Sequence, residues 1–336
     1  RSCLRPARYE ARHTDWDAQP HMTTPTTEQI AALLPEAPAS TALDALVNTL
    51  RERHGASLCS VLLYGSCLRS GDLHDGLVDL YLVVDRYRDF YPGRLQALAN
   101  WLLPPNVFYI ELQDNGRTVR AKYAVLSCRD LENGTTRWFH SYLWGRFTQP
   151  TAIAWSRDSD ARRQALACLA GAVRTFLNRA LPRLPGSGSV KSLWQQGLKL
   201  SYSAELRVEK AGRADELTAF GEHYYLEMTR LVAGSLKFTM ALQHTADELH
   251  YATDIPAVGR GISRLSWPLR KAQGKLLSVL RLLKALFTFD GGLDYIAWKL
   301  ERHSGQPIEI PERVRRWPLI FIWGLFWQLY RRGIFR

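Results

Sequence analysis

Two short apolar runs on either side of a glycine-serine pair constrain the fold of this 336-residue chain most strongly. The first, Cys59 to Tyr64, ends at Gly65-Ser66, and the second, Leu77 to Val84, carries Asp79 near its start. Apolar runs bounded by Gly and Asp predict two β-strands. Glycine has no side chain to hold a ligand off, so backbone N–H groups and a hydroxyl can approach a phosphate there. A carboxylate on the next strand can hold Mg²⁺ against that phosphate, which predicts a minimal nucleotidyl-transfer site.

The rest of the first half predicts an α+β domain around these two strands. Ser40 or Thr41 caps an amphipathic helix, and Pro92-Gly93 opens another that ends at Pro104-Pro105. Val107 to Leu112 and Val119 to Leu126 predict an antiparallel pair joined by an Asn-Gly turn. After Asp158 we expect helices and no further strands, near residues 161–181, 191–211, 213–246 and 264–303.

These elements predict four regions. They are a disordered segment (1–40), a catalytic domain with a nucleotidyltransferase-like mixed sheet (41–157), a mostly helical domain (158–310) and a C-terminal amphipathic helix that binds a membrane (311–336).

A second metal ligand is needed if Asp79 holds Mg²⁺, because a single carboxylate leaves the ion short of protein ligands. Alternation along the strand places Val107, Tyr109 and Glu111 on one face, so Glu111 is a candidate. The alternative, a solvated strand carboxylate, stays open. Asp85 lies roughly 20 Å from Asp79 along an extended strand, so we expect it to cap the strand or to hold a nearby base.

Four segments, in the same order along the chain, resemble motifs of the mitochondrial-type phosphatidate cytidylyltransferases (CDP-diacylglycerol synthases) of the nucleotidyltransferase superfamily. They are Asp79-Leu-Tyr-Leu-Val-Val-Asp85, Val119 to Val125, Ser141 to Pro150 and Leu200 to Arg207. The resemblance implies transfer of a cytidylyl group from CTP to phosphatidic acid, with Mg²⁺ as cofactor.

The resemblance also implies roles for individual residues. Catalytic roles are implied for Asp79, Lys122 and Arg146, and metal binding for Asp79; Glu111 is a metal-ligand candidate from strand alternation alone. Nucleotide binding is implied for Tyr64, Gly65, Ser66, Tyr123, Ser201 and Tyr202, and lipid or phosphate contacts for Glu205, Arg207 and Lys284. For Lys122, Arg146 and the polar residues near 201–207, an ordinary exposed position is the alternative.

The charge and the C-terminal stretch indicate an anionic partner. The formal net charge is +12, and Trp317 to Tyr330 is apolar with arginines at both ends. Its fourteen residues are fewer than the roughly 20 that a transmembrane helix needs, so it suits the membrane interface. The expected contacts are Trp317, Trp323, Trp327, Arg331 and Arg332, and a core helix is the alternative. We expect an anionic membrane surface as partner and no nucleic acid; an oligomer is left open.

The five cysteines are scattered without a C-x-x-C pair, which predicts a reducing compartment and no zinc site. Together with the C-terminal stretch, the family resemblance implies a peripheral protein on the cytoplasmic face of a bacterial inner membrane or the matrix face of the mitochondrial inner membrane.

Two other functions stay open. One is a nucleotidyltransferase that acts on RNA or on a small acceptor, which the positive charge would suit. The other is an inactive membrane-associated scaffold. The scaffold is considered because Tyr81 occupies the position of the second acidic residue of the superfamily pattern, and because Ala204-Glu205 replaces the usual Gly-Asp.

Overall fold

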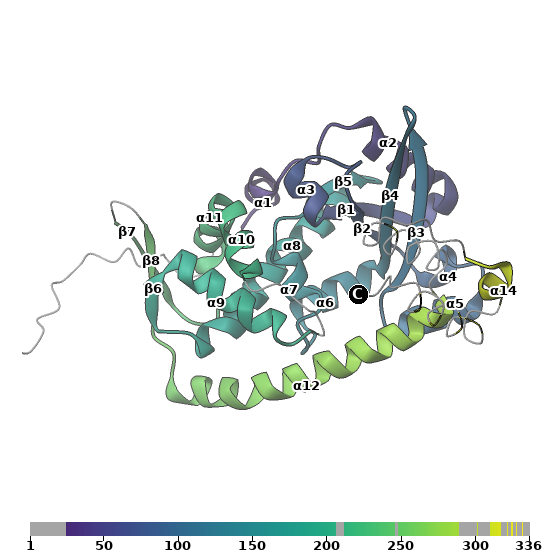
Figure 1. Cartoon of the computed structure of the whole chain (residues 1–336). Helices are drawn as coiled ribbons and strands as arrows, with labels where there is room; N and C mark the ends of the chain where they lie inside the picture. Colours follow the sequence, from purple (N-terminus) through teal and green to yellow (C-terminus); the bar gives the residue numbers. More distant parts are fainter. Residues whose placement is uncertain are drawn as a thin grey trace, which may run out of the picture.

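The structure is a computed structural model, and it describes residues 25–205, 212–245, 248–288 and 310–316, with residues 301, 321, 324, 327 and 331. Its centre is a five-stranded mixed sheet of order β3-β4-β2-β1-β5 (Figure 1). Strands β2 and β4 are parallel, and the other neighbours are antiparallel. The strands are β1 (Leu58–Tyr64), β2 (Val78–Val84), β3 (Asn106–Asp114), β4 (Arg117–Ser127) and β5 (Ala152–Ser156). This sheet and the helices around it confirm the predicted α+β class.

Both faces of the sheet are covered, which explains why its inner strands are almost entirely apolar. Leu80, Leu82 and Val84 of β2 pack in one core, and the alternate residues Tyr81 and Val83 pack in the other. The first core includes α2 (Thr41–His54), α4 (Tyr87–Phe90) and α5 (Arg94–Leu102). The second includes α6 (Cys128–Thr136), α7 (Trp144–Phe147) and α8 (Ser159–Ala180). Asp79 therefore lies on the face that the later helices cover.

The predicted hairpin after α5 is confirmed. Strands β3 and β4 pair from Asn106↔Val125 to Asp114↔Arg117. Asn115 and Gly116 both have positive φ, 50° and 76°, which an Asn-Gly hairpin turn requires.

The second half contains a small sheet, so the prediction that strands end at Asp158 is wrong. Strands β6 (Ser187–Ser189), β7 (Met240–His244) and β8 (Leu249–Thr253) form a sheet of order β6-β8-β7. In β7, Met240 and Leu242 are buried while the residues between and after them are less so. Five residues are too few to distinguish this alternation from a helical pattern.

Helices make up most of the remaining second half, as predicted. The expected helix over 213–246 divides at Gly221, between α10 (Arg213–Phe220) and α11 (Glu222–Ala233). Helix α9 (Val190–Tyr202) precedes them, and the long helix α12 (Ala257–Thr288) follows β8. Figure 1 shows α12 running along one side of the molecule from the small sheet to α5. Among the described residues, no helix is long and apolar enough to cross a membrane.

The predicted disordered segment is too long at its C-terminal end. Residues Thr27–Leu33 form α1, which begins with a capping box between Thr26 and Gln29. Ile30 is buried in the same core as α8 and α11. Residues 1–24 lie outside the described residues.

Candidate active site

Gly65 and Asp79 meet at the edge where β1 ends and β2 begins. The antiparallel register pairs Tyr64 with Asp79. Gly65 has φ +93°, and a Cβ placed on it would lie 2.7 Å from Asp79 Oδ2. The following residue, Ser66, begins the short helix α3 (Ser66–Ser70) and is exposed. Glycine is therefore required both for the backbone turn and for the close approach of the carboxylate.

We expect Gly65→Ala to lower activity far more than Gly71→Ala. Both glycines have positive φ, so each substitution should cost about 1–3 kcal/mol of unfolding free energy. A Cβ on Gly71 meets nothing within 4 Å, whereas one on Gly65 displaces the Asp79 carboxylate. Thermal unfolding and turnover of both variants check this. Equal activity in the two variants would contradict a role for the Gly65–Asp79 contact.

Lys122 lies beside Asp79 because β2 and β4 are parallel. Their register aligns Asp79 with Lys122. Lys122 Nζ is 2.8 Å from Asp79 Oδ1, and the two side chains are 30% and 20% exposed. A carboxylate and an ammonium group thus stand together at the same edge as Gly65, accessible to solvent.

Arg146 extends this cluster from α7. Its Nη1 donates a hydrogen bond to Tyr64 Oη at 3.1 Å, and its Nη2 lies 3.5 Å from Glu205 Oε2. The guanidinium carbon is 5.0 Å from the ring centre of Tyr142. Both members of the ion pair are about nine-tenths buried, and Arg146 Nε has no hydrogen-bond partner among the described residues. The helical half therefore contributes Glu205 directly to the cluster.

A pocket opens beside the Gly65 turn, between the two halves of the chain. Arg69 of α3 and Gln149 line it with Gly65, and Leu217 and Phe220 of α10 form part of its wall. These four flanking residues were not predicted as site residues. Arg69 alone had a sequence signal, a cation four positions after Gly65. The α10 residues reach the pocket only through tertiary packing.

Comparison with known proteins identifies relatives of the middle of the chain, which excludes Gly65 and Asp79. Residues 97–259 match a protein-family model, and the match includes Lys122, Arg146 and Glu205. The family is that of the mitochondrial phosphatidate cytidylyltransferases. The resemblance predicted from the motifs is confirmed, and with it the enzyme class, a nucleotidyltransferase.

Two further comparisons add no functional detail. A nucleotidyltransferase-like protein from Exiguobacterium sibiricum is similar in structure, with 10% sequence identity and a TM-score of 0.24. The similarity covers 64% of this chain and 100% of that chain. A search of curated proteins gave no match.

The structure does not support two of the predicted site residues, Tyr123 from the phosphatidate cytidylyltransferase resemblance and Glu111 from strand alternation. Tyr123 follows Lys122, so its side chain points to the opposite face, where it stacks on Phe108 at 5.3 Å and is 3% exposed. Glu111 lies on β3, and β4 separates that strand from β2. In the β3–β4 register Glu111 is opposite Arg120, two residues away from Lys122. Two strand spacings and two residues place its Cα roughly 12 Å from that of Asp79, too far to share one ion.

Glu111 is also engaged elsewhere. Arg120 Nε donates to Glu111 Oε1 at 3.1 Å, and Tyr109 Oη donates to the same oxygen. Its carboxylate therefore forms an ion pair on the strand, whereas the alternative that the sequence left open was a solvated strand carboxylate.

The 201–207 segment contributes less than the resemblance implies. Ser201 is 2% exposed, and its hydroxyl donates to the carbonyl of Leu198 at 3.1 Å. Its own carbonyl accepts from Ser141 Oγ at 3.3 Å, so Ser201 joins α9 to the loop before α7 instead of facing a nucleotide. Tyr202 is half-buried against the core. Arg207 lies outside the described residues.

Lys284 binds the protein backbone rather than standing free for a phosphate. Its Nζ donates to the carbonyls of Leu103 and Pro105, in the loop after α5. Arg281, one turn earlier, donates to the carbonyl of Pro104 at 2.8 Å. Both residues therefore fasten α12 to the sheet domain.

We expect Lys284 to make the unfolding free energy rise with pH. Burial, helped by the charge of Arg281, lowers the pKa of Lys284 to about 7. A lysine in the unfolded chain has a pKa of about 10.4, so between these values the unfolded state binds more protons and stability increases with pH. The difference in unfolding free energy between the wild type and Lys284→Met should grow in favour of the wild type from about pH 7 to 10, by a few kcal/mol. Urea denaturation at several pH values measures it, and a constant difference would contradict the burial effect.

The predicted membrane helix lies largely outside the described residues, including Trp317, Trp323 and Arg332. Trp327 and Arg331 are helical and exposed.

Proposed function

We propose that this protein transfers the cytidylyl group of CTP to phosphatidic acid at a membrane surface, forming CDP-diacylglycerol and pyrophosphate. The observation that carries the proposal is the family match over a segment whose Lys122 stands 2.8 Å from Asp79, beside the Gly65 turn. Three of the predicted site residues, Gly65, Asp79 and Lys122, thus meet at one edge of the sheet although they come from separate segments.

The reaction suits a site without a strong general base. The phosphate of phosphatidic acid is already an anionic nucleophile, so positioning and charge neutralisation are the main requirements. Gly65 and Ser66 would lie along the triphosphate of CTP. Lys122 would neutralise charge on the departing pyrophosphate, which breaks away as the lipid phosphate oxygen bonds to the α-phosphorus.

Arg146 is suited to the acceptor phosphate. A buried N–H without an acceptor is costly, and Arg146 Nε is such a group among the described residues. A phosphate oxygen that entered between Tyr64 and Tyr142 would satisfy it. Arginine also binds phosphate through two parallel hydrogen bonds, which fixes the headgroup for in-line attack.

The residues present fit Mg²⁺ of the kind that nucleotides bring. Mg²⁺ is commonly held by one or two carboxylates together with substrate phosphates and water, and Asp79 supplies one partly exposed carboxylate at the turn. When bound, the ion would neutralise charge on the triphosphate. Asp79 would hold it, with Lys122 adjacent; Glu111 is too distant to contribute.

The described part of the chain also carries a surface suited to anionic lipid. Exposed apolar side chains recur on α12 at spacings of three, four and seven residues: Ile262, Leu265, Leu269, Leu276 and Leu283. Residues 257–288 contain basic but no acidic side chains, and Arg264 and Lys275 are exposed. This pattern is typical of helices that lie in a membrane interface.

The decisive experiment incubates the protein with labelled CTP, Mg²⁺ and phosphatidate liposomes. Formation of labelled CDP-diacylglycerol supports the proposal. Labelling only of RNA or of a small acceptor would replace it with another nucleotidyltransferase function, and liposome binding without turnover would favour a scaffold. Flotation of the protein with anionic but not neutral liposomes tests the membrane surface.

A further inference from the structure

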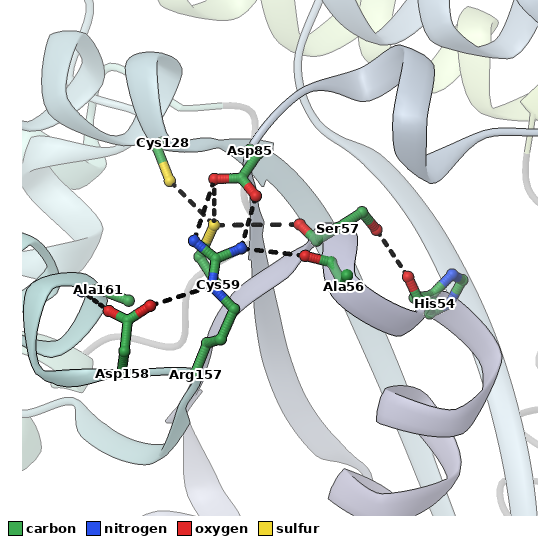
Figure 2. A network of polar contacts seen from close by, with 9 residues as sticks. All are labelled: His54, Ala56, Ser57, Cys59, Asp85, Cys128, Arg157, Asp158 and Ala161. Carbon is green, nitrogen blue, oxygen red and sulfur yellow. Dashed lines mark hydrogen bonds and ion pairs between the residues drawn. The ribbon is translucent and has the colours of Figure 1, made fainter.

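A second polar cluster lies at the far end of β2 from Asp79. Cys59 of β1, Asp85 after β2 and Cys128 at the start of α6 come together there (Figure 2). Cys128 Sγ is 3.4 Å from Cys59 Sγ, which is 3.1 Å from Asp85 Oδ1. One ligand atom from each residue lies within 4.8 Å of the other two. The cysteines are 69 positions apart, so their spacing in the sequence gave no sign of this contact.

Arg157 fixes the carboxylate of this cluster. Its Nη1 donates to Asp85 Oδ2 at 2.6 Å and also to the carbonyl of Ala56 at 3.0 Å. Figure 2 shows the guanidinium beside Asp85, with Asp158 on its other side. Arg157 Nη2 donates more weakly to Asp85 Oδ1, at 3.4 Å, and the same oxygen accepts from Cys59 Sγ at 3.1 Å. Arg157 therefore fixes the direction of the carboxylate, the arrangement of a ligand oriented by a hydrogen-bonding neighbour.

We infer that Cys59, Cys128 and Asp85 form a binding site for a thiophilic divalent cation of the zinc type, with a water as fourth ligand. With bonds of about 2.3 Å to sulfur and 2.0 Å to oxygen, a tetrahedral site separates two sulfurs by about 3.8 Å and a sulfur and an oxygen by about 3.5 Å. The Cys128–Cys59 and Cys59–Asp85 separations are each about 0.4 Å shorter than this, as expected where thiol hydrogen bonds connect these pairs.

Access and charge agree with this assignment. Cys59 is 2% exposed, but Cys128 is half-buried and Asp85 is exposed, so an ion can enter from their side. Two thiolates and a carboxylate carry three negative charges, and a divalent cation with Arg157 offsets them. Binding releases the two thiol protons to solvent. The bound ion would tie together the ends of β1 and β2 and the start of α6.

A titration of the reduced full-length chain with Co²⁺ tests the site. We expect one Co²⁺ per chain, with a sulfur-to-metal charge-transfer band and the visible bands of tetrahedral cobalt. Zn²⁺ should displace Co²⁺, and Zn²⁺ but not Mg²⁺ should raise the thermal midpoint. Cys59→Ser and Cys128→Ser should abolish the thiolate band, and Asp85→Asn should weaken binding at least 10-fold.

Cys168→Ser is the matched control, because Cys168 is a buried cysteine outside the cluster. It should leave the cobalt spectrum unchanged. Absence of a thiolate band in the folded, reduced wild type overturns the site, even if the cysteine variants fail to fold. Formation of a Cys59–Cys128 disulfide in air, with no metal bound by the reduced chain, would also overturn it and identify a redox pair.

Discussion

Asp79→Asn is expected to reduce CDP-diacylglycerol formation by about 10³-fold while the protein stays folded. Asparagine keeps the shape of the side chain but removes the charge that would hold a metal nucleotide against the Gly65 turn. It also leaves Lys122 without the carboxylate that lies 2.8 Å from its Nζ. Because that pair is partly exposed, the unfolding free energy should change by only about 1 kcal/mol. Turnover with labelled CTP measures the loss of activity, and urea denaturation measures the change in unfolding free energy.

Glu111→Gln is the matched comparison for Asp79→Asn. It removes a carboxylate from a strand of the same sheet, with β4 lying between it and Asp79. We expect its activity to stay within about twofold of the wild type, because no shared ion connects the two carboxylates. Full activity in Asp79→Asn, or an equal loss in Glu111→Gln, would remove Asp79 as the proposed metal ligand.

Arg146→Ala is expected to lower both the unfolding free energy of the protein and its apparent affinity for phosphatidic acid. It breaks a buried ion pair with Glu205, for which the usual cost is about 3–5 kcal/mol of unfolding free energy. We expect about 3 kcal/mol, because Arg281 also lies in the electrostatic field of Glu205. The loss of the guanidinium should raise the KM for phosphatidic acid more than the KM for CTP.

Arg163→Ala is the control for this stability change. Arg163 pairs with Asp160 on the exposed surface of α8, where both side chains are more than half exposed. Its removal should cost less than about 1 kcal/mol and leave both KM values unchanged. The double variant Arg146→Ala/Glu205→Ala should recover part of the lost stability, since no buried carboxylate is then left behind. Equal effects of Arg146→Ala and Arg163→Ala on stability would show that the buried pair contributes little.

The sequence predicted the parts of the fold that depend on local patterns. The apolar runs around Gly65 and Asp79 form β1 and β2, and Asn115-Gly116 forms the expected turn, because alternation and positive φ are properties of neighbouring residues. The helix Thr41–His54 was predicted from its amphipathic pattern, which is also a property of neighbouring residues. Strands β7 and β8 were missed, since each is only five residues long and is stabilised by its partner.

The candidate site divides in the same way. Gly65, Asp79 and Lys122 could be selected from motifs, but the motifs also selected Tyr123 and Ser201, which the structure places in the interior. A motif identifies a residue by its position along the chain. The direction of its side chain depends on which face of the strand or helix packs against the core. Residues such as Leu217 and Phe220 carry no motif and join the pocket through the packing of α10.

The sequence by itself determined strands β1 to β4, the Asn-Gly turn and the chemical types of the candidate site residues, because these follow from spacing and local conformational preference, and its motifs carried the family resemblance. Only the tertiary structure decided which of those residues meet. Parallel pairing of β2 with β4 placed Lys122 on Asp79, the packing of α7 against α9 placed Arg146 on Glu205, and the ends of β1 and α6 brought together two cysteines 69 positions apart. Contacts between distant segments depend on sheet register and on burial, and local sequence patterns do not specify either of them.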